Sequence, residues 1–306
     1  MKPTGVLIVG SVPGASPQEV FVRLATGLPG RLQAIPDGET GERWNYIGWQ
    51  LQRFPLVARR IELGGIPLPE SGLPAFTLAD IEPISYDEVA LSSYTEFKQL
   101  RQQNIIPSNV LFQICLPSPY SVLTGHVKST VINAIEPLYE QRFAEAIDHI
   151  VRDIPHDDMG LVDRVIRLCK RIPEDVKLAF HLCYGDLRHK HFIEPQDTSL
   201  LVELANALLA RETLGPRTEW IHMPVPKERT DSAYFSPLTR LRLDSSGSKN
   251  PHIYLGVKRI ETAQANVPFP FGVATECGLG RTPPEEIDSI LRICKEVTEE
   301  PIRENL

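Results

Sequence analysis

Short apolar segments alternate with amphipathic helical segments along most of the chain, and this alternation constrains the fold more than any other feature. Seven of the apolar segments have the length of a β-strand, namely residues 6–10, 32–36, 110–116, 176–184, 219–225, 252–257 and 271–276. A strand, a helix and a second strand in succession predict a right-handed βαβ unit with parallel strands. The chain is therefore predicted to be an α/β protein with a parallel sheet.

Capping residues mark where several of the helices begin. Ser16 is followed by Pro17 at the first helical position and by Glu19, which is the pattern of a capping box. Residues 282–285 repeat this pattern before a stripe of apolar side chains at helical spacing. The other helices are predicted over residues 87–103, 137–153, 162–170 and 198–211.

The ends of the predicted strands favour a barrel. Most of these strands end in polar residues or in glycine and proline, and a (β/α)8 barrel builds its active site from the loops at the strand ends. A doubly wound sheet gathers residues in the same way, but no glycine-rich phosphate-binding motif follows the first strand. We expect a (β/α)8 TIM-like barrel that is incomplete, because no strand is found between the helices predicted at 137–153 and 162–170. The fourth strand is then missing or rearranged.

Length and composition narrow the class of protein. The 306 residues are expected to form a single barrel domain, with a proline-rich insertion at about residues 57–104. A formal net charge of −7 argues against nucleic-acid binding, because such proteins usually carry a basic face. No apolar run approaches the roughly 18 residues that cross a bilayer, so no membrane partner is expected. Without an export signal, the protein is expected to be cytoplasmic, with its five cysteines free of disulfides.

Two predicted strand ends carry side chains that can bind a metal ion. His181 and Cys183 are two residues apart, so they point to the same face of a strand. Cys277 follows the last predicted strand. A Cys2His set with one open position is an established catalytic zinc site, and His222 or Glu276 can complete it. The alternative is that the two cysteines are small buried apolar residues and His181 is a hydrogen-bonded core histidine.

Four motifs, in this order along the chain, resemble a known family. They are Gly10-Ser11-Val12-Pro13, the Pro-Asp-Gly-Glu-Thr-Gly-Glu-Arg segment at 36–43, His181-x-Cys183-Tyr184, and the Glu-Cys-Gly-Leu-Gly-Arg segment at 276–281. Together they resemble the C-terminal catalytic domain of cobalamin-independent methionine synthase. The wider superfamily includes uroporphyrinogen decarboxylase. The resemblance spans nearly the whole chain and implies a barrel fold.

The resemblance also implies roles for individual residues. It implies that Zn2+ is held by His181, Cys183 and Cys277. The family's glutamate ligand has no clear match here, and His222 lies near its expected place. By the same resemblance, Ser11 and Glu39 contact the amino-acid part of a thiol substrate. The chain departs from stand-alone relatives in two places, because it lacks their Gln-x-Asp strand and their polar segment after Gly256.

Five further residues are candidates for the site. Asp186, after the His-x-Cys strand, is a candidate catalytic residue together with Glu39. Asp186 and Arg281 are expected beside the metal or at an anionic group of the substrate. Arg229 and Tyr234 are expected to bind polar groups of the substrate or, alternatively, to pair with each other. Asp37 is a candidate substrate-binding residue.

The leading hypothesis from these residues is a zinc-dependent methyl- or alkyl-transferase that acts on a small thiol or amino-acid-like substrate. Two alternatives remain open. One is a metal-free lyase or decarboxylase of the uroporphyrinogen decarboxylase type, in which Asp37 and arginines bind a polycarboxylate. The other is a catalytically degenerate binding paralogue, which the apparently missing strand motivates.

Overall fold

The computed structural model describes residues 2–45, 47–162, 169, 171–187, 190–191, 194–243, 250–256 and 260–299. In this part of the chain, eight strands form one parallel sheet with the order β1-β10-β9-β8-β5-β4-β3-β2. These strands are β1 (Val6–Leu7), β2 (Ala34–Pro36), β3 (Leu111–Cys115), β4 (Met159–Val162), β5 (Lys177–His181), β8 (Thr218–Pro224), β9 (His252–Gly256) and β10 (Gly272–Ala274). Strands β6 (Asp186–Leu187) and β7 (Lys190–His191) form a separate antiparallel pair.

The strand order is that of a barrel whose seam lies between β1 and β2. Each strand of the sheet pairs with its neighbour in chain order, except that β1 pairs with the last strand, β10, and among the described residues no strand ladder joins β1 to β2. Backbone hydrogen bonds cross this seam from Val6 N to Arg31 O at 2.9 Å and from Val12 N to Gly38 O at 2.8 Å. The protein is thus a mixed α/β structure with a curled parallel sheet, consistent with a partial (β/α) barrel. All seven strands predicted from the sequence are present.

The expectation of a missing fourth strand is wrong. Strand β4 pairs in parallel with both β3 and β5 and fills the place between them. It is four residues long, contains Gly160 and directly follows the 3-10 turn His156–Asp158, so it is too short to show a period of two. Hydrogen bonding to two neighbouring strands holds it in the sheet. The helix predicted at 162–170 lies largely outside the described residues, and Val162 belongs to β4.

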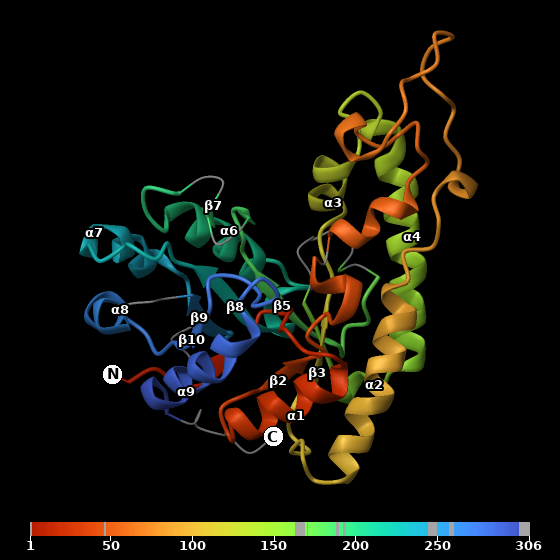
Figure 1. Ribbon diagram of the computed structural model, residues 1–306. Helices are drawn as coiled ribbons and strands as arrows, with labels where there is room; N and C mark the ends of the chain where they lie inside the picture. The colour runs from red at the N-terminus through yellow and green to blue at the C-terminus, as the bar shows by residue number, and fades with distance from the viewer. Residues whose placement is uncertain are drawn as a thin grey trace.

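The helices cover the outside of the sheet (Figure 1). They are α1 (Pro17–Gly27), α2 (Tyr86–Gln102), α3 (Pro119–His126), α4 (Ile132–Asp153), α6 (Ser199–Leu209), α7 (Ser232–Phe235), α8 (Ile260–Asn266) and α9 (Ile287–Val297). Helix α1 begins as predicted, because the Ser16 side chain accepts a hydrogen bond from Glu19 N. Helix α4 begins before residue 137, with Pro137 inside it. Helix α9 follows the 3-10 turn Pro284–Glu286 and has no side-chain cap, so the expected second capping box is not formed.

Aromatic side chains hold α1 and α2 against β3. Phe21 on α1, Phe97 on α2 and Phe112 on β3 are buried, with ring centroids 5.4 to 6.0 Å apart. Burial of a phenylalanine side chain contributes about 1.5–3 kcal/mol. This packing holds both helices against one face of the sheet.

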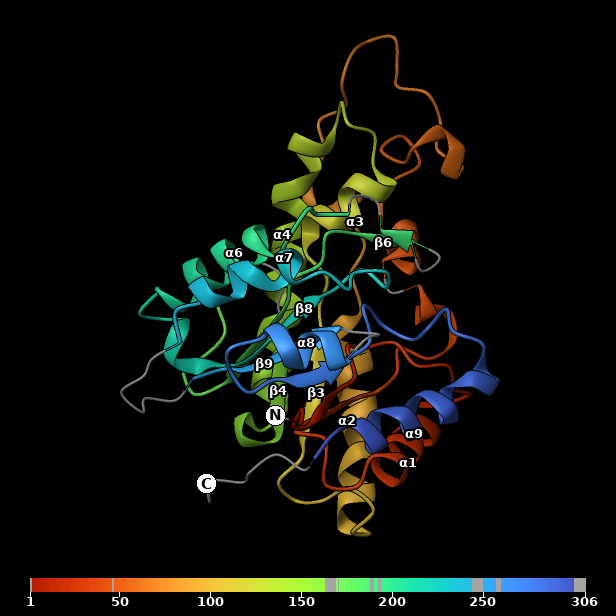
Figure 2. The same cartoon turned by 90° about the vertical axis from the view of Figure 1, so that its left-hand side faces the viewer.

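A long segment between β2 and α2 projects from the body of the molecule (Figure 2). It contains the 3-10 turns Gly41–Trp44, Gly48–Arg53, Ile61–Leu63 and Leu78–Asp80. Lys128 connects it to the region between α3 and α4, because its Nζ donates hydrogen bonds to Val57 O and Ile66 O. The last part of the predicted insertion at 57–104 is α2, the crossover helix between β2 and β3. The single-domain assignment stays a prediction.

None of the helices in the described part of the chain has the length and apolar character needed to cross a membrane.

Two histidines are expected to make the folded state sensitive to mild acid. Burial lowers the pKa of His126 and of His252 below the ordinary value of 6.5. Below about pH 6.5 the unfolded chain therefore takes up more protons than the folded chain, and stability falls as the pH falls further. We expect a lower free energy of unfolding in urea at about pH 5.5 than at about pH 7.5. His126→Gln and His252→Gln should each reduce this difference, and an unchanged difference in both variants would contradict the prediction.

Candidate metal centre

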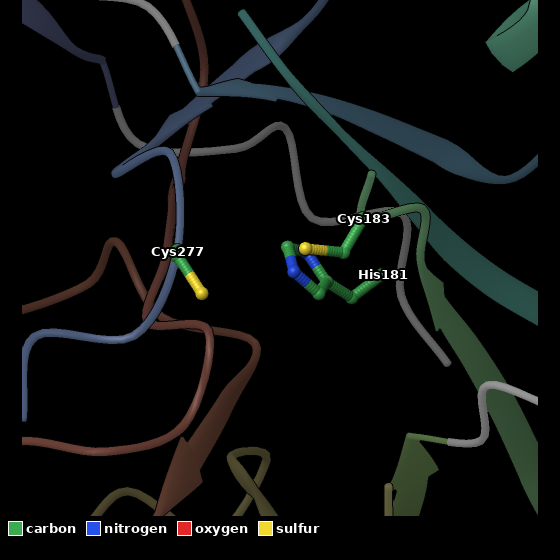
Figure 3. A group of neighbouring side chains, drawn as sticks. All are labelled: His181, Cys183 and Cys277. Carbon is green, nitrogen blue, oxygen red and sulfur yellow. The ribbon is translucent and has the colours of Figure 1, made fainter. Parts of the chain in front are cut away.

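Three of the four predicted metal ligands lie together. Within the described residues, a ring nitrogen of His181 and the Sγ atoms of Cys183 and Cys277 lie within 4.8 Å of one another. His181 is the last residue of β5 and Cys183 follows it, while Cys277 faces them from the loop after β10 (Figure 3). Cys183 lies two residues beyond the end of β5, and its side chain lies next to that of His181 (Figure 3).

The loop that carries Cys277 is held by the turn after β1. Leu279 N donates a hydrogen bond to Ser11 O at 2.6 Å. A Cβ atom added to Gly278 would lie 2.3 Å from Ser11 Oγ, and one added to Gly280 would lie 2.8 Å from Ser11 Cβ. Only glycine permits these close approaches. Ser11, a predicted substrate-binding residue, therefore lies at the base of the loop that positions Cys277.

The three side chains form a site that is closed on one side and open on the other. His181 is 3% exposed, Cys277 is half-buried and Cys183 is exposed. Gly185 N donates a hydrogen bond to Cys183 Sγ at 3.3 Å, which orients the thiol. The exposure of Cys183 disagrees with the alternative that both cysteines are buried apolar residues. A small molecule can approach the group from the side of Cys183.

The donor set suits a borderline-soft metal ion such as zinc. One imidazole and two thiolates are ligands that zinc prefers, and three protein ligands with one open position are typical of catalytic zinc. In a tetrahedral site two sulfur ligands lie about 3.8 Å apart, given zinc–sulfur bonds of about 2.3 Å. The three ligand atoms lie within 4.8 Å of one another, which is compatible with one shared metal ion.

His222, the fourth predicted ligand, lies against His181. The two Nδ1 atoms are 2.5 Å apart, and the rings lie edge to edge, within 11° of parallel and with their centroids 4.7 Å apart. Neither His222 nor Glu276 belongs to the group of three that the described residues form. A role as a metal ligand stays a prediction for both residues.

Asp37 connects the loop after β2 to α2. Its carboxylate accepts hydrogen bonds from Glu39 N at 2.9 Å and from Ser93 Oγ at 2.8 Å, and it forms an ion pair with Arg43 at 2.9 Å. Glu39 has a left-handed backbone with φ of +50°. The structure thus gives Asp37 a role in shaping the loop that presents Glu39.

The Glu39 carboxylate lies beside the same turn that holds the Cys277 loop. A Cβ atom added to Gly10 would lie 3.4 Å from Glu39 Oε1 and 3.4 Å from Cys115 Sγ. A small cavity is lined by Asp37, Glu39, Arg43 and Cys115, among others. Ser11 and Glu39 therefore lie in neighbouring loops, after β1 and β2 respectively, and their role in substrate binding stays a prediction.

Gln113 and Cys115 on β3 also lie beside the turn at Gly10, and neither was predicted from the sequence as a site residue. Burial, and then the Glu39 carboxylate, raise the pKa of the Cys115 thiol well above its usual range. Gln113 Nε2 donates hydrogen bonds to Ile8 O at 2.9 Å and Val9 O at 3.3 Å. Gln113 and Cys115 are two residues apart on β3, so their side chains point to the same face of the strand. Their place toward the carboxyl end of β3 was the one sequence feature that could have indicated a position near the site.

Arg229 and Tyr234 pair with each other. The Arg229 guanidinium carbon lies 5.1 Å from the centre of the Tyr234 ring, and the guanidinium forms an ion pair with Asp231 at 3.6 Å. Tyr234 is 0% exposed, and burial raises its pKa to about 12. A substrate role for these two residues stays a prediction.

Asp186 and Arg281 lie near the ligand segments in sequence. Asp186 begins β6, but its side chain lies outside the described part of the structure. Arg281 is half-buried in the loop that carries Cys277. Their predicted roles in the site are untested.

No protein-family model matches the chain, and the search of curated proteins found no match.

Proposed function

We propose that the protein is a zinc-dependent methyl- or alkyl-transferase that acts on a small thiol. The observation that carries this proposal is the grouping of His181, Cys183 and Cys277 at the carboxyl ends of two strands. Two thiolates and a neutral imidazole balance the charge of Zn2+ and leave one tetrahedral position for a substrate. The order of the four motifs supports the same proposal.

The chemistry follows from what such a site does to a thiol. Zinc, when bound, favours the deprotonated form of a coordinating thiol and so supplies a nucleophile at neutral pH. Cys183 lies at the exposed side of the group, where a substrate thiol can enter. Glu39 and Ser11 lie at the neighbouring strand ends, where they can bind the ammonium and carboxylate groups of an aminothiol. A thiol held in this way would have its sulfur at the open position of the metal.

The finer fold assignment belongs to this proposal. We propose that the sheet closes as a (β/α)8 barrel, so that the strand ends meet around one mouth. The strand order supports closure, as does the hydrogen bonding of Gln113 on β3 to the carbonyl groups of residues 8 and 9 after β1.

The alternatives receive less support. The degenerate-paralogue hypothesis was motivated by a missing strand, and β4 occupies that place. In the metal-free lyase hypothesis Asp37 binds a polycarboxylate, but its carboxylate is engaged with Glu39 N, Ser93 and Arg43.

Binding of a thiol to the cobalt-substituted protein tests the proposal. Cobalt(II) bound by thiolates has sulfur-to-cobalt charge-transfer absorption, and a further thiolate ligand should increase it. We expect cysteine to increase this absorption and serine, which lacks the thiol, to leave it unchanged. A cobalt-loaded protein whose spectrum does not respond to any small aminothiol would overturn the proposal.

Alkyl transfer is then measured with methyl iodide as the electrophile. The carbon–sulfur bond forms, the carbon–iodine bond breaks, iodide leaves and the thiol proton passes to the buffer. We expect the zinc protein to form S-methylcysteine faster than free cysteine does at the same pH. Cys294→Ser serves as the matched control, because Cys294 lies on α9 outside the site.

A further inference from the structure

The pairing of β5 with β8 places two histidines side by side at the site. His181 and His222 are register partners on these parallel strands. Both are buried, at 3% and 0% exposure, and their rings lie within 11° of parallel. The 2.5 Å separation of the two Nδ1 atoms is that of a short hydrogen bond. The Nδ1 atom of each histidine therefore faces the other ring.

The hydrogen bond determines which nitrogen of His181 can bind a metal ion. One ring must donate the proton and the other must accept it. If His181 is the donor, its neutral ring keeps a lone pair on Nε2, the form that a metal ion requires. His222 then accepts through Nδ1 and carries its own proton on Nε2.

His222 also lies near the segment that leads to Cys277. The point that a Cβ atom on Gly256 would occupy is 3.0 Å from His222 Nε2, 3.0 Å from Thr275 O and 2.9 Å from Glu276 Cα. Glycine at position 256 therefore leaves room for the imidazole and for the backbone of residues 275–276. In the sheet, β8 with His222 lies between β5, which carries His181, and β9, which pairs with β10.

We propose that His222 is a positioning residue rather than a metal ligand, fixing the tautomer and orientation of His181 so that Nε2 is the ligand atom. The metal ion then has three protein ligands, His181, Cys183 and Cys277, and its remaining position belongs to water or to a substrate. Partners that hold the second nitrogen of a ligating histidine raise metal affinity by about 10- to 100-fold. This inference rests on the proposed metal site but not on alkyl transfer.

X-ray absorption spectroscopy of the zinc-loaded protein tests the ligand count directly. We expect a ligand sphere of two sulfur atoms, one imidazole and one light-atom ligand. Two imidazoles at the zinc would overturn the proposal. Because this measurement uses the unaltered protein, it does not depend on whether any variant folds.

Two variants test the positioning role. His222→Phe keeps a ring but has no acceptor for the His181 proton, and we expect its zinc affinity to fall by about 10- to 100-fold. His222→Asn keeps an acceptor and should recover most of that loss. Zinc affinity is measured by competition with a chromophoric chelator. Equal zinc affinity in His222→Phe and the unaltered protein would contradict the proposal. An equal loss of zinc affinity in His222→Phe and His222→Asn, with both variants folded, would also contradict it.

The outcomes separate this inference from the proposed function. If the zinc has a single imidazole and His222→Phe binds zinc weakly, the positioning role stands whether or not thiols bind. If thiols bind to the cobalt protein while two imidazoles are found, the proposed function stands and the positioning role fails.

Discussion

Replacing Cys277 with serine is expected to lower zinc affinity by more than about 100-fold, because a thiolate ligand is lost from a set of three. The loop after β10 supplies no second sulfur, and the remaining pair, His181 and Cys183, comes from one segment. Two ligands two residues apart hold zinc far more weakly than three ligands from two strands. Competition with a chromophoric chelator gives the affinity, and elemental analysis of the purified protein gives the metal content.

Cys294→Ser is the matched control for this prediction. Cys294 is half-buried on α9 and does not belong to the group of three ligands that the described residues form. We expect the control to bind zinc as the unaltered protein does, and Cys183→Ser to lose affinity as Cys277→Ser does. Stoichiometric zinc in purified Cys277→Ser would contradict the prediction, because it would show that zinc is bound without the Cys277 thiolate.

The sequence was sufficient to predict the parts of the site that depend on local periodicity. His181 and Cys183 are two residues apart, and side chains along extended backbone alternate between two faces. The sequence alone therefore predicts that these two side chains share a face. Cys277 was predicted from its place after a strand, since barrel strands end at a common face. The structure places these three residues together.

The sequence was not sufficient where position depends on contacts between distant segments. The His181–His222 hydrogen bond follows from the register of two strands 41 residues apart in the chain. Strand β4 was missed because four residues are stabilised by two neighbouring strands and not by a pattern of their own. In both cases the stabilising hydrogen bonds join segments that are far apart in the chain, and the helical and strand periods of the sequence say nothing about such pairs.

Helix α3 was missed for another reason. Ser118 accepts a hydrogen bond from Ser121 N, and Pro119 stands at the first helical position, so the capping signal was present in the sequence. Residues 117–119 directly follow the strand predicted at 110–116, so their pattern is equally typical of a strand end. The helix is eight residues long, which gives its apolar side chains little room to show a period.

Removing the Asp37 carboxylate is expected to lower the free energy of unfolding by about 3–5 kcal/mol, the usual effect of breaking a buried ion pair. The side chains of Asp37 and Arg43 are 11% and 15% exposed, so Asp37→Ala leaves the Arg43 charge without its partner in a nearly dry environment. The variant also removes the acceptor for Ser93 Oγ and for Glu39 N. Urea unfolding followed by circular dichroism measures the loss.

The backbone of Glu39 makes this prediction relevant to the site. A non-glycine residue with φ near +50° costs on the order of 1–3 kcal/mol and persists only where its surroundings fix it. The hydrogen bond from Glu39 N to the Asp37 carboxylate is part of that fixation. Without it, Glu39 is free to relax into an ordinary conformation and to move away from the turn at Gly10.

Asp37→Asn and Ser93→Ala separate the contributions to this effect. Asparagine keeps an acceptor for Glu39 N but loses the charge, so Asp37→Asn should lose less stability than Asp37→Ala. Ser93→Ala removes one hydrogen bond and should cost only about 1 kcal/mol. If Asp37→Ala unfolds at the same urea concentration as the unaltered protein and instead loses affinity for its substrate, then Asp37 binds substrate, as the sequence alone predicts. A large loss of stability that Asp37→Asn partly restores assigns the carboxylate to the architecture of the Glu39 loop.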